Sequence, residues 1–441
     1  MEDIERGASE EKLEKFGIGG DTAHIARAWA KEWCTLIEDI DVSNLTVEYV
    51  LAAREHAARE LGDTLKRDVN GVPSFRATFA ATELLYEELG NAGGELRDKV
   101  EGTGLHPVPH FDRLEKILDI LLEQRKGNKF PYYLDAAQLP QDERNMPVSL
   151  PRGGVEHANF LFASCYYMRG GIKSTTAFRN LSVLYDDDPD LFDPHKAKHR
   201  DPATITESLQ VFGLAFSKNI IAKQWVRNAE RLSEEYSGDP RKLFDNTTDY
   251  DELLRRIQNK NGRGFAGFQE KMTSMLTYYL MSDELIPYFD FPLPVDFHVL
   301  RVSAANGIIS FENLPNDGDI YHDSTLAMLR AMYHDYSITH GVSQLDVCDA
   351  VWSLSSALCG NQPGNVMLEP NRALGRQGRS TQIHPLEINI NDHTQQAMYN
   401  RTCALCPLEE TCEQNYRSKT YYVQGKMVGS PRVRFPRTTL F

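Results

Sequence analysis

The sequence predicts an all-α fold, and three observations support this prediction. Asp112–Glu115 has the form of a capping box, and it is followed at helical spacing by Ile117, Leu118, Leu121 and Leu122. Similar helical stretches recur along the chain, without a β-rich segment or an internal repeat. With 41% hydrophobic and 25% charged residues, the composition is that of a globular chain with a core.

Residues 1–145 are expected to form an accessory helical domain. Residues 1–150 contain 29 acidic and 18 basic residues, a net charge of 18 − 29 = −11 out of −15 for the whole chain. No catalytic spacing occurs here, so we expect a structural or partner-binding role with an unidentified partner. The overall acidity argues against a nucleic-acid partner. After Glu413, however, every charged residue is basic: Arg417, Lys419, Lys426, Arg432, Arg434 and Arg437.

The middle of the chain reads as helices with irregular connections. Residues 127–154 are rich in Pro, Gly and polar residues, which indicates an irregular segment. Helices are expected over His157–Arg169 and from about Ser174, and the acidic stretch 186–190 indicates a solvated turn rather than a metal site. Two more helices are expected within 205–237, broken near Gly213 and ending near Gly238, Asp239 and Pro240.

The cysteines indicate a metal centre. No apolar run is long enough to span a bilayer, and the N-terminus lacks a secretory signal, so we expect a cytoplasmic protein without membrane contact. Seven cysteines are too few for a disulfide scaffold, and Cys403, Cys406 and Cys412 have the spacing C-x2-C-x5-C. Thiolates select zinc or iron–sulfur clusters, and both need four ligands. Candidates for the fourth ligand are Cys359, Cys348, Cys165, Cys34 and His393.

This spacing resembles the C-terminal C-x6-C-x2-C-x5-C of the cluster-bearing endonuclease III and adenine glycosylase family. The first cysteine of the family closes an apolar helix that is rich in Trp, and Asp349–Cys359 looks like that helix, so the resemblance selects Cys359. Residues 360–402 would then be an insertion that loops out between the ligands. The implied cofactor is a [4Fe–4S] cluster on Cys359, Cys403, Cys406 and Cys412, with a structural zinc site as the alternative.

A second match lies upstream. Phe265–Thr273 is similar to the family's hairpin L-P-G-V-G-x-K-T-A, which presents backbone N–H groups to DNA. Gly267 stands at the first glycine, Gln269 replaces the second, and Gly264 precedes them as a further candidate DNA contact. Lys271 stands at the position of the lysine nucleophile of the bifunctional members.

A third match follows 25 residues after that lysine. Pro294–Val302 is similar to the family's V-D-T-H-I-F-R-V, and Asp296 falls on its essential aspartate. A carboxylate near C1′ of the sugar stabilises the positive charge that develops as an N-glycosidic bond breaks. A neutral lysine amine could attack C1′ and give a Schiff base, which permits strand cleavage, whereas water would release only the base. Val211–Ile221 also resembles the family helix that precedes the hairpin.

Together, these matches imply a helix-hairpin-helix (HhH-GPD) DNA glycosylase of two subdomains with an extra N-terminal helical domain. The expected domains are 1–145 (accessory), 146–302 (a six-helix barrel with the hairpin), 303–420 (cluster subdomain with the insertion 360–402) and 421–441 (basic tail). The implied activity is base excision, a step of DNA repair, with AP lyase chemistry as an option. The alternative is a non-catalytic iron–sulfur module for DNA binding or redox sensing.

The expected partner is double-stranded DNA with a damaged or modified base, which places the protein at the nucleoid. Such a base must be flipped into a pocket, and Tyr167 and Arg169 are candidates for pocket or wedge residues. The unmatched N-terminal domain and the insertion suggest an unusual base, such as one found in foreign DNA. The basic tail, with Arg372, Arg376 and Arg379 of the insertion, is expected to contact phosphates.

Overall fold

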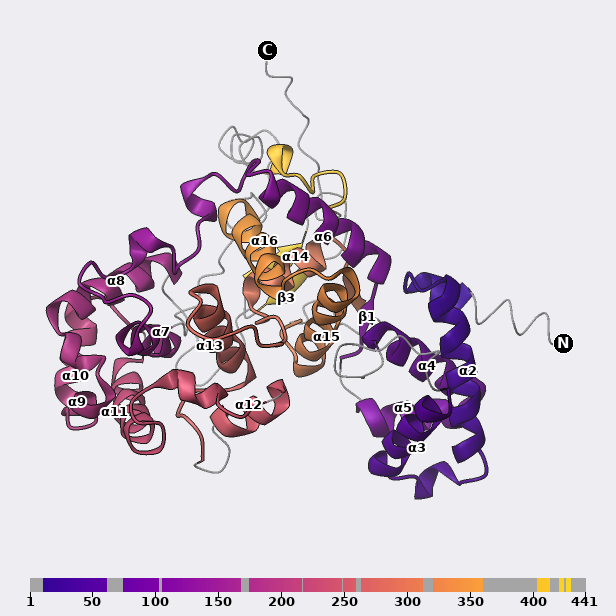
Figure 1. Cartoon of the computed structure of the whole chain (residues 1–441). Coiled ribbons are helices and arrows are strands. Elements are labelled where there is room, and N and C mark those ends of the chain that lie inside the picture. The colour runs from indigo at the N-terminus through magenta and orange to yellow at the C-terminus, as the bar shows by residue number, and fades with distance from the viewer. Residues whose placement is uncertain are drawn as a thin grey trace, which may run out of the picture. The chain divides into compact units, whose positions relative to one another are not determined.

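The computed structural model describes most of the chain as helix, which confirms the all-α class. Two compact units make up the fold: a discontinuous unit of Met1–Leu134 and Phe297–Phe441, and a central unit of Asp135–Asp296 (Figure 1). The structure describes residues 11–61, 74–102, 105–167, 174–215, 217–247, 249–258, 263–311, 320–359, 403–412, 420–423 and 426–429.

The discontinuous unit begins with helices that pack through α2. Trp29 and Trp33 of α2 are buried, and their indole N–H groups donate to the backbone oxygens of Arg54 and Val50 on α3. Ser74 caps α4, accepting a hydrogen bond from a backbone N–H of its first turn. The elements are α2 (Gly20–Ile37), η1 (Val42–Asn44), α3 (Val47–Glu60), α4 (Phe75–Glu88) and α5 (Asn91–Glu101).

The next helix, α6 (Phe111–Lys126), belongs to the same unit as the C-terminal elements. It packs against α16, and Arg125 near its end donates to Asp346 and Asp349 of that helix. The predicted capping box at Asp112 is wrong, because the helix begins one residue earlier and its N-cap is His110. The other elements are α14 (Phe297–Ala305), α15 (Asp323–His340), α16 (Gln344–Ala357) and η8 (Cys403–Leu405).

Short antiparallel strands complete this unit. β1 (Pro107–Pro109) pairs with β2 (Ile309–Phe311), so Val108 lies opposite Ser310. β3 (Thr420–Val423) pairs with β4 (Lys426–Gly429). The first pair joins the N-terminal and C-terminal stretches of chain that share the unit. No described helix is both long and apolar enough to cross a membrane.

The central unit consists of helices that follow the predicted pattern. Helix α8 starts at Ser174, the break between α10 and α11 contains Gly213 at φ +63°, and α11 ends just before Gly238. Its elements are η3 (Asp135–Ala137), η4 (Glu143–Asn145), α7 (Val155–Tyr167), α8 (Ser174–Asp187), η5 (Pro189–Leu191), α9 (Pro194–Ala197), α10 (Pro202–Val211), α11 (Lys218–Glu235), η6 (Pro240–Phe244), α12 (Tyr250–Ile257) and α13 (Glu270–Ser282).

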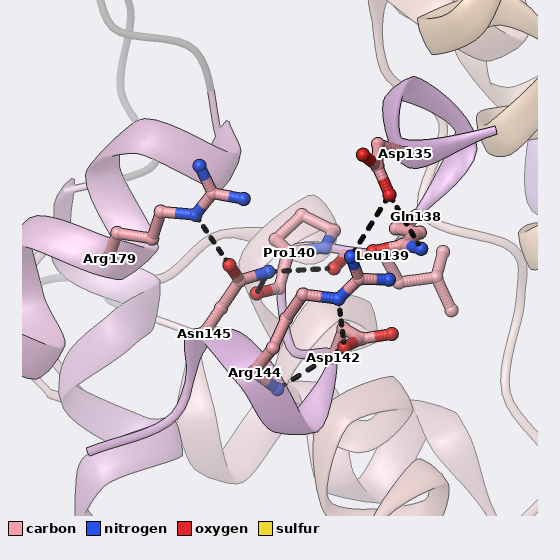
Figure 2. Close-up of polar contacts among 8 residues, drawn as sticks. All are labelled: Asp135, Gln138, Leu139, Pro140, Asp142, Arg144, Asn145 and Arg179. Carbon is pink, nitrogen blue, oxygen red and sulfur yellow. Dashed lines mark hydrogen bonds and ion pairs between the residues drawn. The ribbon is translucent and has the colours of Figure 1, made fainter. Parts of the chain in front are cut away.

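The irregular segment at the start of this unit is held by side chains. Buried Asn145 donates to the backbone oxygens of Leu139 and Pro140 and accepts a hydrogen bond of 2.7 Å from Arg179 of α8 (Figure 2). Asp186 of α8 accepts from the backbone N–H groups of residues 148 and 149. Because these bonds satisfy backbone groups that have no helical or strand partner, the segment is ordered without regular structure.

Candidate functional site

In the region of the predicted hairpin, residues 264–269 form a tight turn that leads into α13. Gly264 and Gly267 have φ values of +77° and +88°, a region that favours glycine. A Cβ atom on Gly264 would lie 2.2 Å from the backbone oxygen of Gln258, so the neighbouring backbone also excludes a side chain. Both glycines are therefore required by the geometry of the turn.

Gln269, which replaces the second family glycine, is accommodated without strain. It is the N-cap of α13, and its φ of −129° and ψ of −177° are extended values that any residue adopts. Its side chain makes no capping hydrogen bond to the helix, and it accepts a hydrogen bond of 2.7 Å from Gln258 Nε2 instead. The substitution thus leaves the backbone of the turn compatible with a helix that starts at Glu270.

The turn is clamped by α11. Asn228, which is fully buried, donates to the backbone oxygen of Ala266 at 2.9 Å and accepts from the backbone N–H of the same residue at 2.6 Å. Arg231 donates to the backbone oxygen of Gly264 at 3.1 Å, and its guanidinium lies 5.5 Å from the ring centroid of Phe265. These bonds fix three consecutive residues of the turn to one helix.

Aromatic rings of α7 also pack against the turn. Phe162 of α7 stacks on Phe268 with a centroid distance of 5.1 Å and meets Phe265 edge to face at 5.2 Å. Tyr166 of the same helix meets Phe268 at 6.0 Å. All four rings are buried, so the turn has little freedom to change shape.

Lys271 lies in the first turn of α13, directly after this clamped segment. Its side chain is half-buried, and no described residue forms a hydrogen bond or an ion pair with its ammonium group. The N-terminus of a helix carries partial positive charge, which disfavours a cation there. Helix stability therefore does not explain a lysine at this position.

Asp296 is half-buried and directly precedes α14, and it lies within electrostatic reach of Tyr279 on α13. Burial, followed by the charges of Cys165, Asp296 and Asp283, raises the pKa of the Tyr279 phenol. Lys271 and Tyr279 are eight positions apart on α13, which corresponds to a rise of about 12 Å along the helix axis. Lys271 therefore lies at the start of α13, whereas Asp296 acts on Tyr279 near the third turn, and no hydrogen bond or ion pair joins the two predicted catalytic residues in the described part of the chain.

The sequence analysis did not single out three further polar residues of this region. The Tyr279 hydroxyl is buried and has no hydrogen-bond partner among the described residues. His157 of α7 is buried, and its Nε2 lies 2.9 Å from Oδ2 of Asp283, the C-cap of α13. The backbone N–H of Gly153 points at His157 Nδ1 from 3.3 Å. No sequence pattern identifies them, because their proximity depends on the packing of α7 against α13.

In the discontinuous unit, Cys359 and Cys406 lie close to one phenol. Burial, and then the charge of Cys406, raises the pKa of Tyr132, and Cys359 adds to this effect. The Tyr132 hydroxyl donates to the backbone oxygen of Ala350 on α16. Two of the four predicted metal ligands thus lie within electrostatic reach of the same phenol, although residues 360–405 separate them in the sequence.

Cys412 is held beside α14. Its thiol lies 3.6 Å from the backbone oxygen of Ala305. Its backbone N–H donates to the backbone oxygen of Leu408 at 2.7 Å. The Leu408 N–H in turn lies 3.4 Å from the Cys406 sulfur. Arg301 of α14 lowers the pKa of Cys359, opposing the larger effect of burial, which raises it. One backbone N–H thus faces the Cys406 sulfur, whereas at Cys359 burial outweighs the guanidinium and the pKa of the thiol is raised.

The remaining predicted residues are distributed as follows. Cys34, Cys165 and Cys348 are buried, Cys34 on α2 beside Glu38, and Cys165 in the central unit. Arg169, His393 and the arginines of the insertion lie outside the described residues, as do the side chains of Tyr167 and Cys403. Among the side chains that are described, no group of three His, Cys, Asp or Glu residues has metal-binding geometry. The complete four-cysteine set therefore stays a prediction.

Comparisons with known proteins give no family for this chain. No protein-family model matches it, and a search of curated proteins finds no match. Its function is therefore argued from the clamped turn, the two residues associated with α13 and the cysteine centre.

Proposed function

We propose that this protein is a DNA glycosylase of the helix-hairpin-helix class, which excises a damaged or modified base from double-stranded DNA. The observation that carries the proposal is Lys271. It is a half-buried cation without a partner among the described residues, placed in the first turn of α13 immediately behind a rigid glycine turn. Functional groups are held in this way when a rigid support must aim them at a ligand.

The arrangement around α13 suits cleavage of an N-glycosidic bond. Asp296 would stabilise the positive charge that develops on the sugar as the base leaves, and it could accept a proton from the nucleophile. If Lys271 attacks C1′ as a neutral amine, the C1′–base bond breaks and a Schiff base forms, from which β-elimination cuts the strand. If water attacks, the base is released and the strand stays intact.

The turn before α13 also supports the proposal of a hairpin that binds DNA. Helices α12 and α13 flank the turn, and the Tyr250 hydroxyl at the start of α12 donates to the backbone oxygen of Glu270. The Gln269 side chain does not cap α13, so it leaves the first N–H groups of that helix to other acceptors, such as a DNA phosphate. Tyr167 and Arg169 stay candidates for contacts to the flipped base.

The cysteine centre is proposed to hold a [4Fe–4S] cluster on Cys359, Cys403, Cys406 and Cys412. The fit rests on the proximity of Cys359 and Cys406 to Tyr132 and on the N–H group that faces the Cys406 sulfur. When bound, the cluster supplies four iron–sulfur bonds that would tie the C-terminal turn to the end of α16. Its role would be structural, because the residues of the glycosylase chemistry belong to the central unit.

Borohydride trapping tests the proposal. The full-length protein is incubated with labelled duplexes that each contain one modified base, among them bulky pyrimidines typical of foreign DNA, and base release is measured with and without borohydride. We expect base release from at least one duplex. A covalent adduct that is absent in Lys271→Ala identifies the lysine as nucleophile, and release without an adduct identifies water. Asp296→Asn should slow release about 100-fold or more.

Lys223→Ala is the matched control, because Lys223 is an exposed lysine on α11 that makes no contact with the turn. It should release the base as fast as the unchanged protein. The glycosylase proposal fails if no duplex loses its base although the protein binds DNA. That result would favour the alternative, a DNA-binding or redox-sensing module. If only ordinary oxidised pyrimidines are cut, the substrate is not a base of foreign DNA.

A further inference from the structure

The discontinuous unit contains a pocket of about 1100 Å³ that the proposed DNA chemistry does not use. Two helices line it at the spacing of a helix face. The lining residues of α4 are Phe75, Thr78, Phe79, Thr82, Glu83 and Tyr86, and those of α15 are Ser324, Ala327, Met328 and Ala331. Faces of this kind normally pack on another element. Because here they border a pocket as large as those of small-molecule sites, which measure about 300–1000 Å³, an occupant is expected.

One end of the pocket is apolar. Phe16 and Phe79 meet edge to face with a centroid distance of 5.1 Å, and Phe75 lies 6.2 Å from Phe79. Met328 and Ala331 of α15 line the same pocket. Aromatic rings and a flexible thioether accept a planar or an aliphatic body equally well.

The polar end carries ion pairs that are internally satisfied. Glu83, with only 4% of its side chain exposed, pairs with Lys12 at 3.4 Å and with Arg97. Arg97 also pairs with Glu101 at 3.5 Å and lies over the ring of Tyr86. Burial raises the pKa of Glu101. Both acids are thus paired with a base of the lining.

The basic side chains of the lining are more accessible than Glu83. The exposed fractions are 29% for Lys12, 69% for Lys15, 26% for Arg54 and 32% for Arg97. Lys15 and Arg54 pair with Glu11 at 4.0 Å and with Glu55 at 3.1 Å. Ion pairs on the surface contribute little to stability. Lys15 and Arg54 can therefore leave these pairs and bind a ligand at a small cost in free energy. The four bases and two acids of the lining leave 4 − 2 = +2 formal charges, and the acids Glu11, Glu55 and Glu87 pair with three of these bases from outside the lining.

We propose that this pocket binds a small organic anion, a molecule with an apolar or planar body and one acidic head group. The body would lie against Phe75, Phe79 and Met328, and the head group would face Lys15 and Arg54. The site goes beyond the proposed glycosylase function, because it uses neither Lys271 nor Asp296 and lies within the other unit.

Two fluorescent probes that share a ring system test the site on the full-length protein. Anilinonaphthalene sulfonate has an apolar body and an anionic head, whereas N-phenyl-1-naphthylamine has the same rings without the charge. We expect saturable binding of one sulfonate per chain, about tenfold tighter than binding of the neutral probe. Equal affinity for the two probes would exclude an anion site.

Variants locate the binding. Ala327→Trp, at an exposed position of α15, fills the pocket and should weaken both probes about tenfold or more, whereas Ala203→Trp on α10 should leave them unchanged. The double variant Lys15→Gln, Arg54→Gln should weaken only the sulfonate, with Lys31→Gln on α2 as the control. Circular dichroism checks that each variant is folded. A folded Ala327→Trp that binds the sulfonate normally would show that the probe sits elsewhere.

Competition distinguishes the sources of such an anion. A deoxynucleoside monophosphate and decanoate each combine one acidic head with a planar or an aliphatic body, and both are titrated against the bound sulfonate. Displacement by the nucleotide indicates a heterocyclic ligand, and displacement by decanoate an acyl ligand. If millimolar amounts of both leave the sulfonate bound, the proposal of a natural amphipathic anion is overturned.

Discussion

The turn before α13 and the cysteine centre are held in different ways. The turn is fixed by buried side chains of its own unit, with Asn228 and Arg231 bonded to its backbone and four aromatic rings packed around it. At the cysteine centre, the contacts to sulfur are 3.4 and 3.6 Å long, and the thiols come from segments that are distant in sequence. The turn is thus preorganised by the protein alone, whereas the proposed cysteine centre would need a bound group to close it.

The largest effect is expected from loss of a cysteine ligand. Cys406→Ser should lose the bound iron and lower the free energy of unfolding of the discontinuous unit by about 5 kcal/mol or more, since metal binding is coupled to folding. Iron content and thermal unfolding of the purified protein measure this. Cys165→Ser, a buried cysteine of the other unit, should keep its iron. Equal iron content in the two variants would mean that Cys406 does not hold the metal, and the contrast between a preorganised turn and a metal-closed cysteine centre would be lost.

The iron content of purified variants also identifies the fourth metal ligand. Cys359→Ala should purify without iron, and Cys348→Ala, a buried change on α16, should retain it. The opposite result would assign the ligand to Cys348, and the proximity of Cys359 to Tyr132 would then have no role in metal binding.

In the turn, a glycine substitution should be costly even without a metal. Gly264→Ala forces a side chain into a positive φ and against the backbone of Gln258, for an expected loss of about 3 kcal/mol. Gly341→Ala has a φ of +62° with nothing within 4 Å, so it isolates the φ strain of about 1 kcal/mol. Urea unfolding compares the two. Equal losses would mean that the turn relaxes around the new side chain and is not rigid.

The amide clamp should contribute slightly less. Asn228→Ala leaves a buried backbone N–H and C=O of Ala266 unpaired, which should cost about 2 kcal/mol. Asn219→Ala, at an exposed position of the same helix, should change stability by less than about 0.5 kcal/mol. Urea unfolding again gives both values, and a neutral Asn228→Ala would show that the rings alone hold the turn.

The smallest effect concerns pH, and it tests an ionisable side chain that bonds to the backbone in the discontinuous unit, whereas the amide of Asn228 in the turn does not ionise. Asp335 of α15 accepts from the backbone N–H of Phe75 on α4, and burial raises its pKa above 3.8 although Arg76 opposes this. The folded state therefore holds its proton more tightly, so the stability contributed by Asp335 falls as pH rises from 3.8 through the raised pKa.

The variant Asp335→Asn removes this ionisation. Its free energy of unfolding relative to the unchanged protein should therefore increase as pH rises through that window, by about 1 kcal/mol. Urea titrations across the acidic range check the trend. A constant difference between the two proteins would mean that Asp335 ionises equally in the folded and unfolded states.

Some of this architecture could be read from local sequence. Helical periodicity and turn residues are properties of neighbours in the chain, and so the helix at Ser174, the break near Gly213 and the end near Gly238 agree with the structure. The cap of α6 was misplaced because Asp112 and His110 are both compatible with a helix start, and the packing of the preceding β1 decides between them.

The candidate site likewise combines features that could be predicted from the sequence with contacts that only the tertiary structure shows. The sequence by itself showed the cysteine spacing, and its resemblance to a known family pointed to Lys271 and Asp296 as candidates, since both depend on residue type and order. Only the tertiary structure decided that Gln269 needs no positive φ, that Asn228 clamps the turn and that Cys359 lies with Cys406 near Tyr132. Such contacts join segments that are distant in sequence, and they arise from the burial of whole helix faces rather than from any local pattern.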